Sequence, residues 1–239
     1  MNNPTYLWVS ILYEAIIIAS SVTWLVYAGL GGSEGSKPSR RTGVALVAGL
    51  IFSWLGLVML LGGWGLFKAS LDPSVPYLAF AFALPILAGC WFMFGTRRGG
   101  ELVRSMPQEW TIGIQAYRGL GAIFLILNGL SLMPSEFAIP AGFGDVITGI
   151  LAIPVAAYYS STLPGRKFVA VVWNVFGLAD LVLASTLGFL TSPSPFQLLA
   201  IDHPNLLATQ FPLVLVPVFA VPISILLHIA SLKKLVARL

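Results

Sequence analysis

Four ionisable side chains interrupt long apolar stretches of the sequence: Glu14, Arg118, Asp145 and Asp180. A charged side chain at the centre of a membrane-spanning helix costs roughly 2.5–3.5 kcal/mol on insertion scales, so each one needs a partner or a purpose. A buried acid can hold a proton or a cationic solute, and a buried base can neutralise that acid. We therefore expect these residues to form a ligand- or proton-binding site inside a membrane protein.

Asp180 is the strongest candidate because of its depth. Counted from the ends of the predicted helices at about 1.5 Å per residue, Asp180 lies about 15 Å deep, Glu14 about 12 Å and Asp145 about 6 Å. Asp180 also shares a helix face with Trp173 and Gly177, where the glycine leaves room beside an aromatic ring. Such a face is typical of a cavity. An acid that only fixes helix packing through hydrogen bonds is the other interpretation, and both stay open.

Arg118 also has two interpretations. It lies about 10 Å from the opposite boundary of the membrane, so its long side chain can reach lipid phosphates from there. Alternatively it forms an ion pair with Asp180, whose depth differs by only about 5 Å, within reach of an extended arginine. The sequence leaves both interpretations open.

Asn174 and His228 complete the set of polar candidates. Asn174 lies about 100° around its helix from Trp173, so we expect it to face a neighbouring helix. His228 shares a face with Ser224 and Ser231 near one end of the last helix, and we interpret it as a residue of the membrane interface rather than a metal ligand. With one cysteine and two histidines in the chain, no metal site is indicated. No cofactor can be named either.

A stripe of small residues predicts which way the Asp145 side chain points. Gly149, Ala152 and Ala156 follow Asp145 at i+4, i+7 and i+11, so all four residues share one helix face. Small residues allow another backbone to approach closely. We therefore expect Asp145 to point into the bundle and Gly149 to lie in a helix contact.

The composition identifies the class of protein. Of 239 residues, 57% are hydrophobic and 9% charged, and the mean hydropathy is +0.90, whereas soluble domains carry about 25% charged residues. We predict an all-α membrane protein, residues 1–239, that forms one transmembrane domain and has the lipid bilayer as its main partner. Its seven predicted helices span about 7–30, 43–67, 77–95, 111–133, 141–160, 168–190 and 212–232.

The basic residues predict the orientation. All but two of the 13 Lys and Arg residues lie in the first, third and fifth loops or at the C-terminus, and the exceptions are Lys68 and Arg118. Lys and Arg concentrate in cytoplasmic loops, which predicts an outside N-terminus and a cytoplasmic C-terminus in a cell membrane, expected to be a bacterial inner membrane. This topology also accounts for the net charge of +4, so no nucleic-acid partner is indicated.

Two similar segments suggest an internal repeat. Ala83–Ile86 and Ala220–Ile223 each hold a proline between apolar residues, and a pair of basic residues follows each segment. This pattern predicts two parallel units, helices one to three and five to seven, joined by the fourth helix. Chance alignment of two proline-containing membrane helices is the alternative.

Three segments carry a resemblance to a known group of proteins. Residues 141–149 (AGFGDVITG), 173–181 (WNVFGLADL) and 211–217 (FPLVLVP) resemble a loose family of uncharacterised bacterial multipass membrane proteins, over roughly the C-terminal half of the chain. That resemblance implies no activity. The order of three, one and three helices is similar to that of SWEET and PQ-loop carriers, which implies two units that rock around the fourth helix.

Three classes of function remain open. The first is a proton- or cation-coupled carrier of a small solute, in which Asp180 is helped by Glu14 and Asp145. The second is a non-catalytic, receptor-like or complex-associated subunit whose acids only specify packing. The third and least favoured is an intramembrane enzyme that acts on a lipid-soluble substrate through Asp180, Arg118 and His228. The sequence does not identify the solute or ligand, or the oligomeric state.

Overall fold

The computed structural model describes residues 5–31, 37–69 and 76–236, and over these ranges it contains helices and no strand. Seven of its helical segments are long and apolar enough to cross a membrane, which confirms the predicted number and the all-α class. The helical elements, some of which join into one span, are α1 (Thr5–Gly31), α2 (Lys37–Gly63), α3 (Tyr77–Gly95), α4 (Arg97–Ser105), α5 (Gln108–Gly113), η1 (Ile114–Gly121), α6 (Ala122–Gly129), α7 (Ser135–Ser160), α8 (Arg166–Thr191), η2 (Leu207–Thr209), η3 (Val216–Ala220) and α9 (Val221–Val236).

The fourth span is built from three pieces. It begins as α5, continues as the 3₁₀-helix η1 and ends as α6, without a break in the chain. Long 3₁₀ stretches are uncommon, because their hydrogen bonds have poorer geometry than those of an α-helix. Gly113, Gly119 and Gly121 fall in or beside this stretch, and glycine lowers the stability of an ordinary α-helix. The seventh span, η3 followed by α9, is also irregular. Its first turn is a π-helix that contains Pro217.

The fifth span departs most from its predicted limits. We expected it to begin at residue 141, but α7 begins at Ser135. Glu136 and Pro140 both lie in the first turns of this helix, which starts directly after Pro134. Because the helix begins six residues earlier than predicted, Asp145 lies about 9 Å deeper in the span than the predicted start implied. The second and fourth spans end near residues 63 and 129, each four residues before the predicted end.

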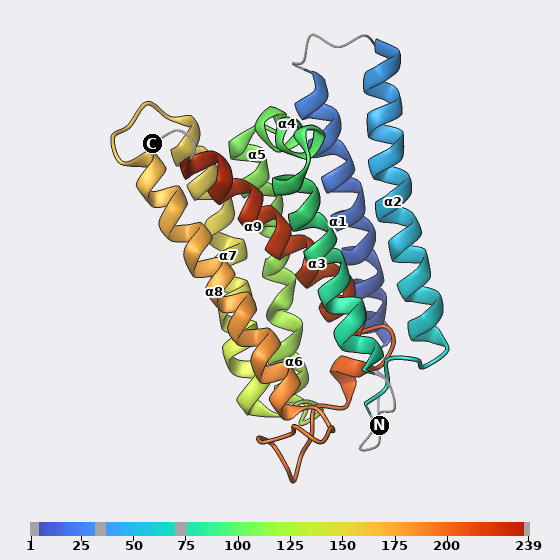
Figure 1. Ribbon diagram of the computed structural model, residues 1–239. Coiled ribbons are helices and arrows are strands. Elements are labelled where there is room, and N and C mark those ends of the chain that lie inside the picture. The colour runs from blue at the N-terminus through green and yellow to red at the C-terminus, as the bar shows by residue number, and fades with distance from the viewer. Residues whose placement is uncertain (1–4, 32–36, 70–75, 237–239) are drawn as a thin grey trace.

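The spans differ in how deeply they are packed. The span η3–α9 is the most buried, and Figure 1 shows it running obliquely across the other helices. α7 packs along both the fourth span and α8, whereas α2 packs mainly on α1 and is among the most exposed spans. An exposed apolar helix face is expected where lipid is the solvent. The polar interior of the bundle is therefore built by the fourth span, α7, α8 and α9.

Two apolar clusters enclose this polar interior. One holds Tyr117 and Ile123 of the fourth span together with Ala141 of α7. The other holds Ile112 of the same span and Ala152 of α7. On α7, Asp145 lies between Ala141 of the first cluster and Ala152 of the second, and on the fourth span Arg118 directly follows Tyr117 of the first cluster.

The two ends of the bundle differ in charge. The short helix α4, the turn between α7 and α8 and the end of α9 lie together at one end, here called the α4 end (Figure 1). Among the described residues, this end carries the basic residues Arg97, Arg98, Arg104, Arg166, Lys167, Lys233 and Lys234. The turn between α6 and α7 and the loop after α8 lie at the opposite end. The alternation of basic loops thus has a structural counterpart, and the inside orientation of the α4 end stays a prediction.

Candidate functional site

Arg118 lies at the centre of a polar cluster inside the bundle. Its guanidinium Nε donates to Asp145 Oδ1 at 2.7 Å, and its Nη2 donates to Asp180 Oδ2 at 2.5 Å. Nη1 donates to the carbonyl oxygen of Gly177 at 3.1 Å. The side chain is only 2% exposed. One planar group therefore joins η1 to α7 and α8. Of the two interpretations of Arg118, the ion pair with Asp180 is present, and the one in which Arg118 reaches toward lipid phosphates is wrong.

His228 of α9 is the fourth partner of this guanidinium. Its Nε2 lies 3.0 Å from Arg118 Nη1, and its Nδ1 lies 3.0 Å from Asn174 Oδ1. Arginine has no acceptor, so Nε2 must carry the lone pair and Nδ1 the hydrogen that is donated to Asn174. Asn174 Nδ2 in turn donates to the Ala170 carbonyl at 2.7 Å. The histidine is therefore held as one neutral tautomer.

The position of His228 corrects the sequence interpretation. We interpreted it as a residue of the membrane interface, but it is fully buried in the middle of the polar cluster. The oblique path of α9 brings this part of the helix to the level of Arg118, which residue counting along a straight helix could not show. We call Arg118, Asp145, Asp180, His228 and Asn174 the Arg118 cluster.

Glycines make room for the charged groups. A Cβ atom at Gly144 would lie 1.7 Å from Asp180 Oδ1, and one at Gly121 would lie 2.7 Å from Asp145 Oδ2. At Gly177 a Cβ would lie 2.5 Å from His228 Cε1. Each of these carboxyl and imidazole groups therefore fits against bare backbone, and a side chain larger than hydrogen would displace it.

The predicted small-residue stripe of α7 forms the closest helix contact of the site. A Cβ atom at Gly149 would lie 2.2 Å from the backbone nitrogen of Gly119, so the two backbones touch at this level. Asp145, one turn away on the same face, points into the bundle as the stripe predicted, and there it binds Arg118. The contact thus fixes the register between η1 and α7 that the ion pair needs.

Trp173 supports the cluster from the side. Its indole Nε1 donates to the Thr148 carbonyl of α7 at 3.1 Å, and its ring centroid lies 5.0 Å from that of His228. Both interactions are buried, so Trp173 joins α8 to α7 and limits the movement of the imidazole. It contacts the cluster through the histidine ring and does not contact the guanidinium by any hydrogen bond in the described part of the chain.

The depth of Asp145 was predicted wrongly. The count from residue 141 placed it about 9 Å nearer the boundary than Asp180, but both carboxylates bind the same guanidinium. The start of α7 at Ser135 accounts for the error. The structure therefore gives Arg118 two acidic partners where the sequence suggested one.

Glu14 lies apart from these hydrogen bonds. It is 8% exposed on α1 and near enough to Asp145 and Tyr117 to interact with both electrostatically. It makes no hydrogen bond or ion pair with any residue whose structure is described. Tyr117 itself donates to Ser224 Oγ at 2.6 Å, because the serine hydroxyl hydrogen is donated to the Ala220 carbonyl.

Several polar residues near the cluster were missed from the sequence. Gln108, Gln115 and Thr148 are buried, and each has at least one side-chain atom without a hydrogen-bond partner among the described residues. Gln108 and Gln115 are seven residues apart, a spacing that places them on one helix face and could have revealed a polar stripe. Their alignment with Arg118 depends on the 3₁₀ geometry, which the sequence did not indicate.

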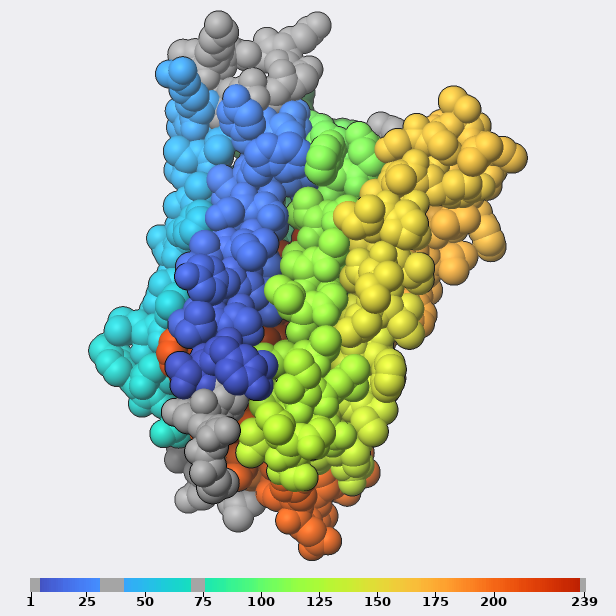
Figure 2. Space-filling model, turned by 180° about the vertical axis from the view of Figure 1, so that it is seen from behind, coloured from blue at the N-terminus to red at the C-terminus, as the bar shows by residue number. Residues whose placement is uncertain are grey.

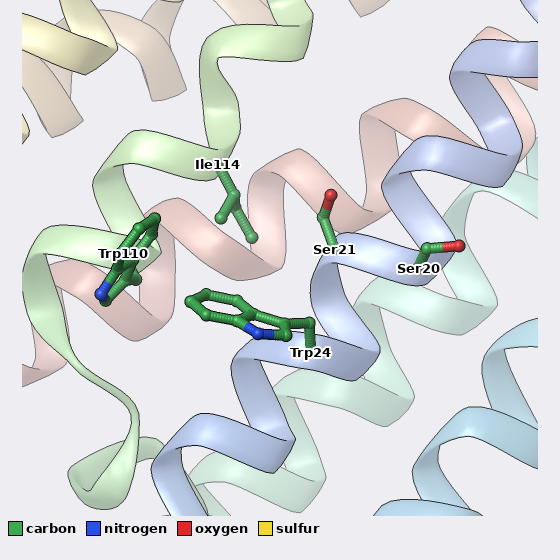
Figure 3. Close-up of a pocket in the computed structure, with 5 residues that line it drawn as sticks. All are labelled: Ser20, Ser21, Trp24, Trp110 and Ile114. Carbon is green, nitrogen blue, oxygen red and sulfur yellow. The ribbon is translucent and has the colours of Figure 1, made fainter.

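A shallow depression of about 380 Å³ lies outside the cluster, between α1 and the fourth span. Figure 2 shows a narrow gap between these two elements, with atoms of α9 visible at its bottom. The rings of Trp24 and Trp110 meet edge to face there, with centroids 4.7 Å apart, and the Ile114 side chain points toward them while the Ser20 hydroxyl points away (Figure 3). The depression is thus largely apolar and faces the lipid side of the bundle.

The comparisons with known proteins give a family but no function. No curated protein and no solved structure matched the chain. The sequence pattern of one family, described as Domain of unknown function (DUF8737), matches residues 75–236. The match contains every member of the Arg118 cluster and leaves Glu14 outside. Because the matched residues make up most of the chain, the protein belongs to this family of unknown function.

Proposed function

We propose that the protein is a proton-coupled secondary carrier and that the Arg118 cluster is its proton-binding site. The observation that supports this proposal is the charge of the cluster. One guanidinium is shared by two carboxyl groups, so the ionised cluster has an excess of one negative charge inside the bundle. An uncompensated charge is costly at this depth, and taking up one cation removes that cost.

The packing favours a proton over a larger cation. The oxygens that do not bind Arg118, Asp180 Oδ1 and Asp145 Oδ2, lie against the backbones of Gly144 and Gly121. A hydrated or chelated ion would need room beside them, whereas a proton needs none. The third buried acid, Glu14, lies near enough to Asp145 to interact with it electrostatically.

The arrangement of the helices supports a carrier. Arg118 joins the fourth span to α7, α8 and α9 at one level, so a change of protonation at Asp145 or Asp180 alters the attraction among four spans at once. Such a shared contact is a suitable element for coupling proton binding to helix movement. The two-unit repeat remains a prediction that would give this movement its axis. The solute is not identified by these contacts.

A pH jump on reconstituted protein tests the proposal. Proteoliposomes are adsorbed on a solid-supported membrane sensor, the pH of the bath is changed, and the displacement of charge is recorded. We expect a transient current from the wild-type protein that is lost in Asp180→Asn, because the amide cannot take up a proton. The control variant is Glu101→Gln on α4, where an exposed carboxyl is removed outside the bundle, and its current should equal that of wild type.

Two results would count against a proton-binding carrier. The first is the absence of any transient current from folded wild-type protein. The second is a full current in Asp180→Asn and also in Asp145→Asn, which would mean that neither carboxyl takes part. A cluster that only fixes helix packing, as expected for a non-catalytic subunit, gives the first result.

A further inference from the structure

Unpartnered polar atoms lie beside the Arg118 cluster and between it and the α4 end. The Gln115 side chain is fully buried, and neither its Oε1 nor its Nε2 has a hydrogen-bond partner in the described ranges of the chain. Gln108 Oε1 and Thr148 Oγ1 are in the same situation. Buried polar groups are nearly always hydrogen-bonded, and where protein atoms are out of reach an ordered water molecule usually serves. These atoms therefore mark positions for internal water.

The 3₁₀ geometry places Gln115 on the same row as Arg118. With three residues per turn, Gln115, Arg118 and Gly121 lie one above another along η1. Gly121 packs against Asp145, and Arg118 binds the Asp145 carboxylate, so this row faces the interior of the bundle. One 3₁₀ turn is about 6 Å long, so the Gln115 amide lies about that far from the guanidinium level, toward the α4 end.

A second polar row on α9 faces the first. Ser231 and His228 are three residues apart on that helix, and each contacts the fourth span. Gln108 Nε2 donates to Ser231 Oγ at 2.6 Å, and Arg118 contacts His228 at 3.0 Å. Gln115 follows Gln108 by seven residues and precedes Arg118 by three, so it lies between these two cross-links. The interface of the fourth span and α9 is therefore polar from Gln108 to the cluster.

The row reaches the α4 end of the bundle. Gln108 is the first residue of α5 and is 3% exposed. Just before it, the Met106 carbonyl accepts a hydrogen bond from Lys234 Nζ of α9. Lys234 thus lies at the point where the polar interface meets the basic end of the protein.

Thr148 adds a further polar group beside the histidine. A Cβ atom at Gly177 would contact both His228 Cε1 and Thr148 Cγ2, so the threonine side chain lies beside the imidazole ring. Its hydroxyl oxygen is another buried atom without a described partner. The unpartnered atoms of Gln108, Gln115 and Thr148 thus lie at the level of the cluster or on its α4 side, and all three residues lie on spans that contribute to it.

We infer that the interface between the fourth span and α9 holds a row of water molecules that leads from Gln108 past Gln115 to the Arg118 cluster. A water molecule can both donate to an amide oxygen and accept from an amide nitrogen, so it matches the two free atoms of Gln115. The proposal that this row is the path by which the proton reaches Asp145 and Asp180 from the α4 end rests on the proposed function. The proposal that the interface is hydrated does not rest on it.

Cysteine labelling tests the hydration directly. In a Cys90→Ser background, Gln115→Cys and Ile112→Cys are compared for their rate of reaction with a small, water-soluble, cationic methanethiosulfonate reagent. Ile112 is a matched control, because it is fully buried and lies between Gln108 and Gln115 on the same span but packs in an apolar cluster. The reactive thiolate forms in a hydrated site, so we expect Gln115→Cys to react at least about tenfold faster. Equal rates for the two variants would overturn the inference.

The replacement Gln115→Leu tests the path without a thiol. Leucine is similar in size to glutamine and removes both polar atoms, so the protein should fold and keep the amplitude of the pH-jump current. We expect the rise of that current to slow by about tenfold, because the water row is interrupted. An unchanged rate in a folded variant would overturn the role of the row as a path.

The two proposals can fail separately. If Gln115→Cys is labelled quickly but wild-type protein gives no pH-jump current, the interface is hydrated and the proton-coupled carrier is overturned. If the current is present but Gln115→Cys reacts no faster than Ile112→Cys, the carrier stands and the water row is overturned.

Discussion

At the scale of single residues, the geometry of the guanidinium explains why the buried base is an arginine. Its three nitrogens bind four groups: Nε binds Asp145, Nη2 binds Asp180, and Nη1 binds both the Gly177 carbonyl and His228. A lysine ammonium offers three donors from one point and cannot reproduce this fork. The planar group therefore sets the distances among α7, α8 and the fourth span as well as their charge balance.

Replacing Arg118 should strongly destabilise the protein. Arg118→Gln leaves two buried carboxyl groups without their cation, and breaking a buried ion pair from one side costs about 3–5 kcal/mol. We expect a clear fall in melting temperature in detergent. The matched control is Arg97→Gln, which removes an arginine from an exposed pair with Glu101 and should leave the melting temperature unchanged. Equal shifts for the two variants would show that the cluster is not the main ionic contact of the bundle.

Because Arg118 has two acidic partners, the melting temperature lost in Arg118→Gln should be recovered fully only when both partners are also changed. Adding Asp180→Asn to Arg118→Gln removes only one of the two unpaired carboxyl groups, so recovery should be partial. The triple variant that also carries Asp145→Asn replaces the ion cluster by neutral amides, and we expect it to recover most of the melting temperature. Full recovery with Asp180→Asn alone would mean that the pair of Arg118 with Asp145 contributes little to stability.

At the scale of elements, the contact between η1 and α7 depends on two glycines. Gly149→Ala places a Cβ atom 2.2 Å from the Gly119 backbone nitrogen, so one backbone must move. Overpacking of this kind costs typically about 1–3 kcal/mol. The control is Gly56→Ala on α2, where a Cβ atom meets nothing within 4 Å and alanine is the better helix former. We expect a lower melting temperature for the first variant and an equal or higher one for the second.

A reversed order of these two variants would contradict the helix arrangement itself. If Gly56→Ala lowers the melting temperature more than Gly149→Ala does, then α2 has a close partner that the bundle described here lacks, and α7 does not touch η1. The comparison therefore tests the packing independently of any function.

The elements also show how much of the fold could be predicted from the sequence. Hydropathy gave the number of spans correctly, because a run of about 20 apolar residues has few other uses. The start of α7 was missed, because Glu136 and Pro140 look like loop residues, and the missed turn moved Asp145 away from Arg118 in the prediction. The oblique path of α9, which buries His228, depends on tertiary packing and leaves no periodic signal. The sequence therefore singled out the residues that the structure brings together, with Glu14 apart from them, but not the hydrogen bonds that join them.

At the scale of the whole molecule, the charge difference between the two ends predicts the orientation. Basic residues at the α4 end favour the cytoplasm by the positive-inside tendency. In intact cells with a Cys90→Ser background, we expect Asp202→Cys in the loop after α8 to react with an impermeant maleimide. Glu101→Cys on α4 should react only after the membrane is permeabilised. Both positions are exposed, so accessibility within the protein does not limit either reaction. The opposite pattern would show the reverse orientation.

The family match covers one part of the molecule and leaves the first two helices outside. Residues 75–236 contain α3 to α9, which hold the Arg118 cluster and the polar interface with α9. α1 and α2 lie outside the match, and with them Glu14. The features on which both proposals depend therefore lie in the part of the chain that the family shares.

The 3₁₀-helix in the fourth span ties the ion cluster to the dimensions of the bilayer. Its eight residues are about 4 Å longer than the same residues in an α-helix, because the rise is about 2.0 Å instead of about 1.5 Å per residue. Rewinding it into an α-helix would shorten the span and turn Gln115 out of line with Arg118. A length mismatch of about 4 Å costs on the order of 1 kcal/mol, comparable to one hydrogen bond. Membrane thickness thus contributes to the free energy of the cluster, and lipid chain length becomes a physical variable of the site.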